Sequence, residues 1–256
     1  MTRAVDRAPS PELAPLLKSY PRRRPPLSPA HQKVYAEQYR LNREGAGAIE
    51  NVAQRLERWM HRRVASMQGG PVLELGAGTL NHRRYEDPSI AYDVVEPFRE
   101  LYAGKPEAQS VRAFYDSVAD IPADRRYARV ISIAVLEHME NLPADIANAA
   151  LLLDERGVFQ AGIPSEGGFL WGAAWRLSTG ISYYLRTGLD YATLMRHEHL
   201  NSAPEIVTIL RHLFADVRLR RFPLPWHHAS FYTYVEARSP DRVRCRSLLG
   251  AGERAR

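Results

Sequence analysis

Two carboxylates and two glycines near the middle of the chain have the types and spacing of a nucleotide-type cofactor site. Gly76 and Gly78 follow a short apolar run, where glycine permits a tight turn and the close approach of a ligand to the backbone. Glu74 lies just before this pair. Glu96 ends the next apolar run about twenty residues later, where an acid can accept hydrogen bonds from both hydroxyls of a ribose.

Two positions separate the possible cofactors. A dinucleotide fingerprint has a third glycine that lets a helix pack on the strand and face a pyrophosphate, but Asn81 stands there. Glu74 would repel a pyrophosphate and attract a cation. S-adenosylmethionine has a cationic amino group, a sulfonium and a ribose but no phosphate, so the residues favour it. An NAD-dependent oxidoreductase remains the disfavoured alternative.

Four ordered segments make the chain resemble the class I S-adenosylmethionine-dependent methyltransferases of the small-molecule type. They are residues 74–78, 94–97, 116–122 and 130–138, which follow one another in the order and roughly the spacing of that family. The resemblance implies an α/β fold, doubly wound around a seven-stranded, mostly parallel, Rossmann-like sheet whose seventh strand is antiparallel. It also implies S-adenosylmethionine as the cofactor.

The resemblance assigns roles to individual positions. Glu74, Gly76 and Gly78 would line the methionine part of the cofactor, Glu96 would hold the ribose, and residues 116–118 would lie beside the adenine. Leu80 replaces a frequent third glycine, so Asn81 and His82 are expected to face the cofactor, with a solvated turn as the alternative for His82. The full expected cofactor-binding set is Glu74, Gly76, Ala77, Gly78, Asn81, Glu96, Pro97, Asp116, Ser117, Val118, Val135 and the N-terminal Tyr35 and Tyr39.

Three histidines are candidates for a catalytic base, because an imidazole titrates near neutral pH. His138 directly follows the fourth predicted strand and is nearest the expected methyl group; packing is its alternative role. His197 and His199 end an insertion at residues 164–203. No third ligand has suitable spacing, so no metal site is predicted.

The insertion itself is rich in aromatic residues and glycine. Rings with glycines suit a lid over an organic acceptor, and a second core cluster or an oligomer contact is the alternative. The expected reaction is in-line methyl transfer to an oxygen, less favourably a nitrogen, of a small molecule or saccharide. The rival interpretation is an inactive, cofactor-binding interaction protein.

Length, composition and charge predict the domain organisation. The 256 residues are 45% hydrophobic, with a net charge of +6 and one cysteine. We expect one domain over residues 31–237, with disordered basic ends at 1–30 and 238–256 that carry most of the positive charge and leave nucleic acid an unlikely partner. Cys245 is interpreted as incidental. The absence of a long apolar run predicts no membrane span and a cytoplasmic protein, with a monomer and a homo-oligomer both left open.

Periodicity and turn residues place the elements. Helices are expected at 31–43, 48–66, 143–153 and 204–214, and strands at 71–75, 92–96, 111–115, 129–134, 157–163, 217–222 and 230–237.

Overall fold

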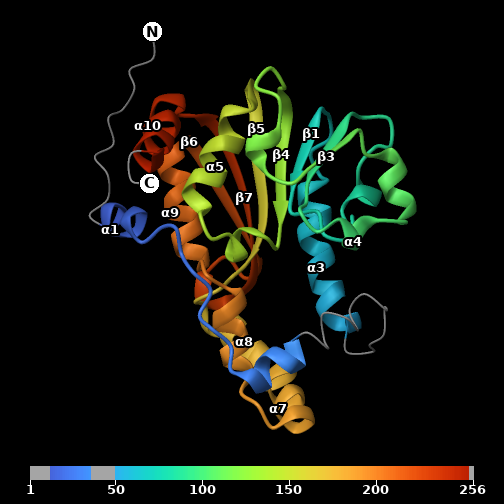
Figure 1. Cartoon of the computed structure of the whole chain (residues 1–256), viewed down its shortest axis with the longest axis vertical. Helices are drawn as coiled ribbons and strands as arrows, with labels where there is room; N and C mark the ends of the chain where they lie inside the picture. Colours follow the sequence, from blue (N-terminus) through green and yellow to red (C-terminus); the bar gives the residue numbers. More distant parts are fainter. Residues whose placement is uncertain (1–11, 36–49, 254–256) are drawn as a thin grey trace.

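A seven-stranded sheet forms the centre of the computed structural model, which describes residues 12–35 and 50–253 (Figure 1). The strands run in the order β3-β2-β1-β4-β5-β7-β6. They are β1 (Val72–Leu75), β2 (Tyr92–Val95), β3 (Ala113–Tyr115), β4 (Tyr127–Ile133), β5 (Leu153–Pro164), β6 (Phe214–Pro223) and β7 (Ser230–Pro240). The first five pair in parallel, and β7 is antiparallel to both β5 and β6. The predicted fold class is confirmed.

Helices cover both faces of this sheet, as Figure 1 shows. Strands β1 and β2 are buried along their whole length because each face has an apolar layer against it. On one face lie α1 (Leu13–Lys18), α5 (Leu142–Leu151), α9 (Ala203–Leu213) and α10 (Arg242–Glu253), and on the other α3 (Glu50–Val64). Short helices α4 (Arg99–Tyr102), η1 (Arg83–Tyr85), η2 (Pro106–Ser110), η3 (Val118–Asp120), η4 (Leu136–His138) and η6 (His227–Ala229) fill the connections.

The order of the strands reverses between β1 and β4. The connections that leave the carboxyl ends of these two strands therefore run to opposite faces, which opens a crevice at that edge of the sheet. Among the residues expected to bind the cofactor, those at 76–78, 81, 96–97 and 135 follow β1, β2 and β4 and so lie at this edge.

The insertion after β5 is a helical lobe at the lower end of Figure 1. It contains α6 (Phe169–Trp175), the π-helical turn η5 (Arg176–Gly180), α7 (Ile181–Thr187) and α8 (Tyr191–Glu198). Tyr183 and Leu194 pack with Leu27 of the N-terminal segment in a small separate core. Part of the insertion thus forms a second apolar cluster, which was one of the expected alternatives.

The expectation of a disordered N-terminal end was wrong for residues 12–30. Helix α1 buries Leu13, and residues 19–28 form a strap along α9 and the lobe. Arg22 pairs with Glu205 at 2.7 Å, Arg24 pairs with Glu198 at 3.2 Å, and the Tyr20 hydroxyl donates to Asn201. These arginines look solvated in the sequence because their acidic partners lie far along the chain. Residues 1–11 lie outside the described part.

The C-terminal end is also ordered where disorder was expected. Strand β7 continues to Pro240, and α10 follows it. Cys245 is fully buried in the main core, so it is a packing residue and not incidental. Arg242 donates to the carbonyls of Leu151 and Leu153, which fixes the helix against the end of α5. Arg242 and Arg244 of this tail are thus held by carbonyls and by Asp241.

None of the helices in residues 12–35 and 50–253 combines the length and the apolar character that a transmembrane span requires.

Candidate active site

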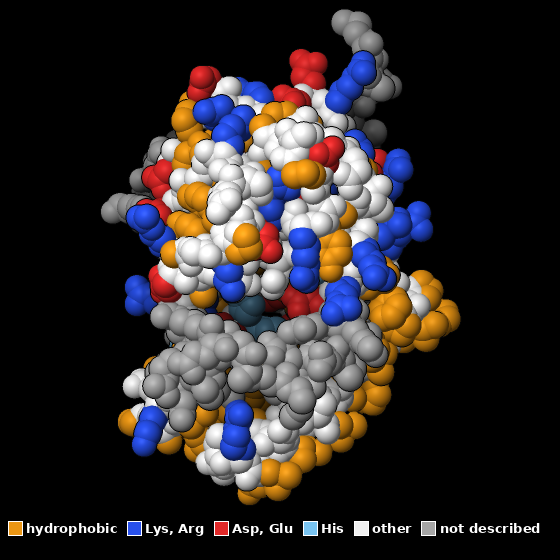
Figure 2. All heavy atoms as spheres, turned by 90° about the vertical axis from the view of Figure 1, so that its right-hand side faces the viewer, with side chains coloured by type: hydrophobic (Ala, Val, Ile, Leu, Met, Phe, Trp, Pro, Cys, Tyr) orange, Lys and Arg blue, Asp and Glu red, His pale blue; other side chains and the backbone are white. Residues whose placement is uncertain are grey.

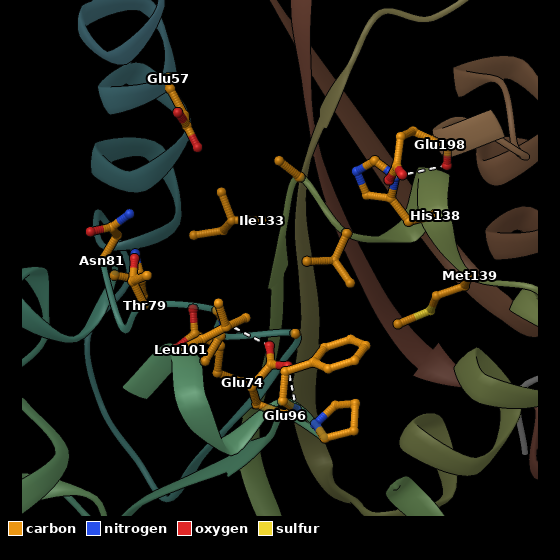
Figure 3. Close-up of a pocket in the computed structure, with 18 of the residues that line it drawn as sticks. Glu57, Glu74, Thr79, Asn81, Glu96, Leu101, Ile133, His138, Met139 and Glu198 are labelled. Carbon is orange, nitrogen blue, oxygen red and sulfur yellow. Dashed lines mark hydrogen bonds and ion pairs between the residues drawn. The ribbon is translucent and has the colours of Figure 1, made fainter. Parts of the chain in front are cut away.

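A cavity of about 970 Å³ opens at the carboxyl edge of the sheet, between β1, β4 and the lobe. This volume lies at the upper end of the range for small-molecule sites. Acidic and histidine side chains are visible in the hollow of Figure 2. In Figure 3, Glu74 and Glu96 lie at one end and His138 and Glu198 at the other, with Glu57 reaching in from α3.

The glycine turn after β1 is fastened to the end of β2 by Glu96. The backbone N–H of Gly78 donates to Oε2 of this carboxylate at 2.8 Å, and the N–H of Phe98 donates to Oε1 at 3.0 Å. Each oxygen keeps a lone pair for a ligand. The glutamate therefore both shapes the turn and presents an acceptor surface to the cavity.

Gly76 is required by geometry as well as by conformation. Its φ is +68°, and a Cβ built on it would lie 2.4 Å from Cγ1 of Val135. Gly78 has a φ of +51° but open space around it. The two glycines thus provide a matched pair for substitution. A side chain would strain the backbone at both positions, but it would clash with a neighbour only at Gly76.

We expect Gly76→Ala to weaken cofactor binding more than Gly78→Ala. Left-handed backbone costs a non-glycine residue about 1–2 kcal/mol, which both variants bear, while the clash with Val135 forces the turn away from β4 only in Gly76→Ala. Urea unfolding and calorimetric titration of both variants measure the two effects. Equal losses in the two variants would show that the contact with Val135 does not shape the turn.

Glu74 is buried below the glycine turn, where the Tyr92 hydroxyl donates to its Oε2 at 2.8 Å. Burial raises the pKa of Glu74. The side chain still lines the cavity, so a cationic ligand group there would compensate a carboxylate that is otherwise costly to ionise.

A chain of buried polar groups supports the cavity wall. Arg129 of β4 donates to both carboxylate oxygens of Glu86, at 2.7 and 2.8 Å. Glu86 accepts from Nε2 of His82 at 3.0 Å, and His82 shares a hydrogen bond with His61 of α3. Burial, with His82 and Arg84 nearby, lowers the pKa of His61 to about 3, so its ring stays neutral. His82 is therefore buried in a network and does not lie in a solvated turn.

At the opposite end of the cavity, His138 has a defined orientation. Its Nδ1 lies 2.8 Å from the backbone carbonyl of Glu198, and since a carbonyl only accepts, Nδ1 carries the proton. In the neutral ring Nε2 is then unprotonated and can accept a proton. Oε1 of Glu137 lies 3.8 Å from this nitrogen.

The other two candidate histidines have different surroundings. His199 packs edge-on against His138 with ring centroids 4.9 Å apart, and its Nδ1 lies 2.9 Å from Oε2 of Glu166. Burial opposes protonation of His199, but the bond to Glu166 and nearby carboxylates raise its pKa overall. His197 lines the cavity and donates from Nδ1 to the carbonyl of Pro25 in the strap. Of the three, His138 and His197 face the cavity.

Carboxylates surround the space beside these histidines. Glu57 lines the cavity, and its pKa is raised by burial and by the proximity of Glu137. Glu137 is buried, and its Oε2 has no hydrogen-bond partner among the described residues. Within residues 12–35 and 50–253, no group of three or more His, Cys, Asp or Glu has the arrangement of a metal site.

The cavity brings together most of the expected cofactor-binding residues. Those that line it are Tyr35, Glu74, Gly76, Ala77, Gly78, Asn81, Glu96, Pro97 and Val135. Asp116, Ser117 and Val118 do not line it: the N–H and hydroxyl of Ser117 instead donate to Asp120 in a capping box at the start of η3. Tyr39 lies outside the described residues.

Several residues that line the cavity were not predicted from the sequence. Phe98 and Leu101 follow Glu96 closely in the sequence, and apolar residues at this position could have been predicted to line the cavity. Glu57, His61, Arg24 and Glu198 also line the cavity, but they come from distant parts of the chain and carry no local pattern that marks them.

The comparisons with known proteins agree with this geometry. No protein-family model matches the chain, and no curated protein matches it by sequence. Solved structures do match. A SAM-dependent methyltransferase from Thermotoga maritima, described as a possible histamine N-methyltransferase, shares 12% identity over 82% of this chain and 96% of its own, with a TM-score of 0.55. The chain has the class I methyltransferase fold.

Two further structures with this methyltransferase fold show the same likeness. An O-methyltransferase family protein from Burkholderia thailandensis shares 17% identity over 90% of this chain and 68% of its own, with a TM-score of 0.53. The magnesium protoporphyrin IX methyltransferase of Synechocystis PCC 6803, solved with bound SAH, shares 14% identity over 80% and 95%, with a TM-score of 0.52. These similar folds serve different acceptors, so the fold does not name the acceptor.

Proposed function

We propose that this protein is an S-adenosylmethionine-dependent methyltransferase that transfers a methyl group to an oxygen of a small-molecule or saccharide acceptor. The observation that carries the proposal is the pairing across one cavity of the Glu96-fastened glycine turn with His138. One end offers carboxylates to a cationic, ribose-containing ligand, and the other offers a proton acceptor.

The residues at the carboxylate end fit this cofactor. Glu96 would accept from the ribose hydroxyls, and Glu74 would attract the cationic amino group directly or through water. Phe98 and Leu101 offer an apolar wall next to Glu96, so we place the adenine against them and not beside Asp116. Pyrophosphate would meet two carboxylates here, which argues against the NAD-dependent alternative.

The chain's own residues then act on the acceptor. The cofactor supplies an electrophilic methyl group on a sulfonium. The protein would hold the acceptor oxygen toward that methyl group, and Nε2 of His138 would take the hydroxyl proton as the oxygen–methyl bond forms and S-adenosylhomocysteine leaves. The carbonyl of Glu198 keeps the imidazole in the required tautomer. His199, which is bonded to Glu166, packs edge-on against His138 and supports its ring.

A nitrogen acceptor is the second candidate. The unpartnered Oε2 of Glu137 and the cavity-lining Glu57 would favour an acceptor that carries an ammonium group. In that case His138 would remove the proton of the ammonium before or during attack. Parallel assays with hydroxylated and amino-bearing acceptors would separate the two candidates.

Calorimetric titration with S-adenosylmethionine, S-adenosylhomocysteine and NAD tests the proposed cofactor. We expect micromolar binding of the first two and none of NAD. If none of the three compounds binds, the proposal is contradicted, and binding of NAD alone would favour an oxidoreductase.

Glu96→Ala should weaken S-adenosylmethionine binding by about 1–3 kcal/mol, the range for losing hydrogen bonds to a charged group. The variant also releases the N–H groups of Gly78 and Phe98, which adds to the loss. Glu107→Ala, outside the cavity, is a matched control with the same change of charge. An unchanged dissociation constant in Glu96→Ala would overturn the ribose assignment.

A further inference from the structure

The lobe exposes an unusual set of large apolar side chains. Along α6, η5 and α7, five of them are between 49% and 78% exposed: Phe169, Leu177, Ile181, Tyr184 and Leu185. Single exposed hydrophobic residues are ordinary, but a contiguous group marks an interaction surface. Hydrophobic side chains gather along the lower edge of the molecule in Figure 2, where this lobe lies.

A second segment extends this apolar surface. Leu224 and Trp226, in the connection between β6 and β7, are also exposed. The next residue, His227, touches the start of α6, since a Cβ on Gly168 would lie 2.7 Å from its carbonyl oxygen. A groove of about 440 Å³ opens within the lobe, and Trp175, Ile181, Tyr184 and Leu185 are among its lining residues.

The charges on this surface are mainly positive, although the exposed Asp190 also lines the groove and lies 3.8 Å from Arg196. Residues 169–187 contain Arg176 and Arg186, both exposed, and no Asp or Glu. The Arg176 guanidinium lies 4.3 Å from the centre of the Trp175 ring. Arginine beside tryptophan and tyrosine, next to exposed aliphatic side chains, is the composition of helices that lie in a membrane interface.

We infer that the α6–α7 face of the lobe docks on the surface of an anionic lipid bilayer. The apolar side chains would enter the boundary between headgroups and acyl chains, and Arg176 and Arg186 would meet the lipid phosphates. A second copy of the chain fits less well, because a two-fold contact through this face would bring Arg176 and Arg186 of both copies together.

Docking would place the catalytic cavity close to the bilayer. His197 and Glu198 of α8, in the same lobe, line that cavity. An acceptor that is itself carried in the membrane would then reach the site without leaving the lipid surface. The docking surface and its test do not depend on the proposed reaction.

Sedimentation of the full chain with vesicles tests this inference. We expect the protein to bind vesicles of phosphatidylcholine mixed with phosphatidylglycerol more tightly than vesicles of phosphatidylcholine alone. Leu177→Ser/Leu185→Ser and Arg176→Glu/Arg186→Glu should each lower the partition coefficient roughly tenfold or more. Val243→Ser, which alters an exposed hydrophobic residue of α10 at the other end of the molecule, should leave it unchanged.

Other outcomes would overturn the inference. Equal binding by the lobe variants and the wild type would place the lipid contact elsewhere, and no binding to either vesicle would remove it. A concentration-dependent dimer that Leu177→Ser/Leu185→Ser abolishes, without vesicle binding, would assign the face to a second copy. Because the substituted side chains are exposed, unchanged thermal unfolding and S-adenosylmethionine affinity verify that the variants fold.

Discussion

Replacing His138 by asparagine should slow methyl transfer to an oxygen acceptor by roughly 10²–10⁴-fold in a single turnover, the usual contribution of a general base. Asparagine has a side-chain N–H that can keep the bond to the carbonyl of Glu198 but has no equivalent of Nε2. The affinity for S-adenosylmethionine should stay close to that of the wild type. Rapid-quench measurement, with an acceptor found by screening hydroxylated metabolites and sugars, provides the rate.

Two further variants separate proton transfer from packing. His199→Ala removes the ring that supports His138 and should have a smaller effect on the rate, while His228→Ala changes an exposed histidine before β7 and should have none. A normal single-turnover rate in His138→Asn would exclude His138 as the base. His197, whose Nδ1 is likewise bonded to a carbonyl, would then be the next candidate.

The second large effect is expected from Arg129→Met. This arginine is 2% exposed and forms the bidentate pair with Glu86. Methionine fills a similar volume but leaves the carboxylate buried without its cation, and breaking one side of a buried pair costs about 3–5 kcal/mol of unfolding free energy. Since Glu86 also orients His82 beside the cavity, S-adenosylmethionine should bind more weakly as well.

Urea unfolding measures the loss of stability in Arg129→Met. Arg218→Met, which removes the partner of Asp216 in an exposed pair, is the control and should change stability by less than about 1 kcal/mol. A double variant, Arg129→Met/Glu86→Gln, removes the uncompensated charge and should recover part of the stability. Equal stability of Arg129→Met and the wild type would show that the buried pair contributes nothing net.

The strands and the position of the glycine turn beside Glu96 were predictable because their signals are local. The apolar runs that end at Leu75 and Val95 lie within a residue of the observed strands. The glycine turn and Glu96 sit where parallel strands must end. Strand β5 is longer than expected because it begins directly after α5, with no turn residue to mark the boundary.

Other parts of the site depend on contacts between distant residues. Nothing near Glu57 or His61 in the sequence shows that α3 turns them toward the cavity, because both occur in a helix whose apolar pattern alone is evident. The residues expected beside the adenine, 116–118, do not line the cavity, and Ser117 is bonded to Asp120 instead. The arginines of the N-terminal end looked solvated because Glu205 and Glu198 are remote in sequence from Arg22 and Arg24.

The strap has a consequence for the order in which the molecule assembles. Tyr20 and its partner Asn201 are separated by 181 residues, so their contact closes most of the 256-residue chain into a loop. Such long-range contacts form slowly, after the local ones. During synthesis the strap emerges first but must wait for α8 and α9 before it can dock. Arg24 would thus complete the cavity wall late in folding, after α8 has formed.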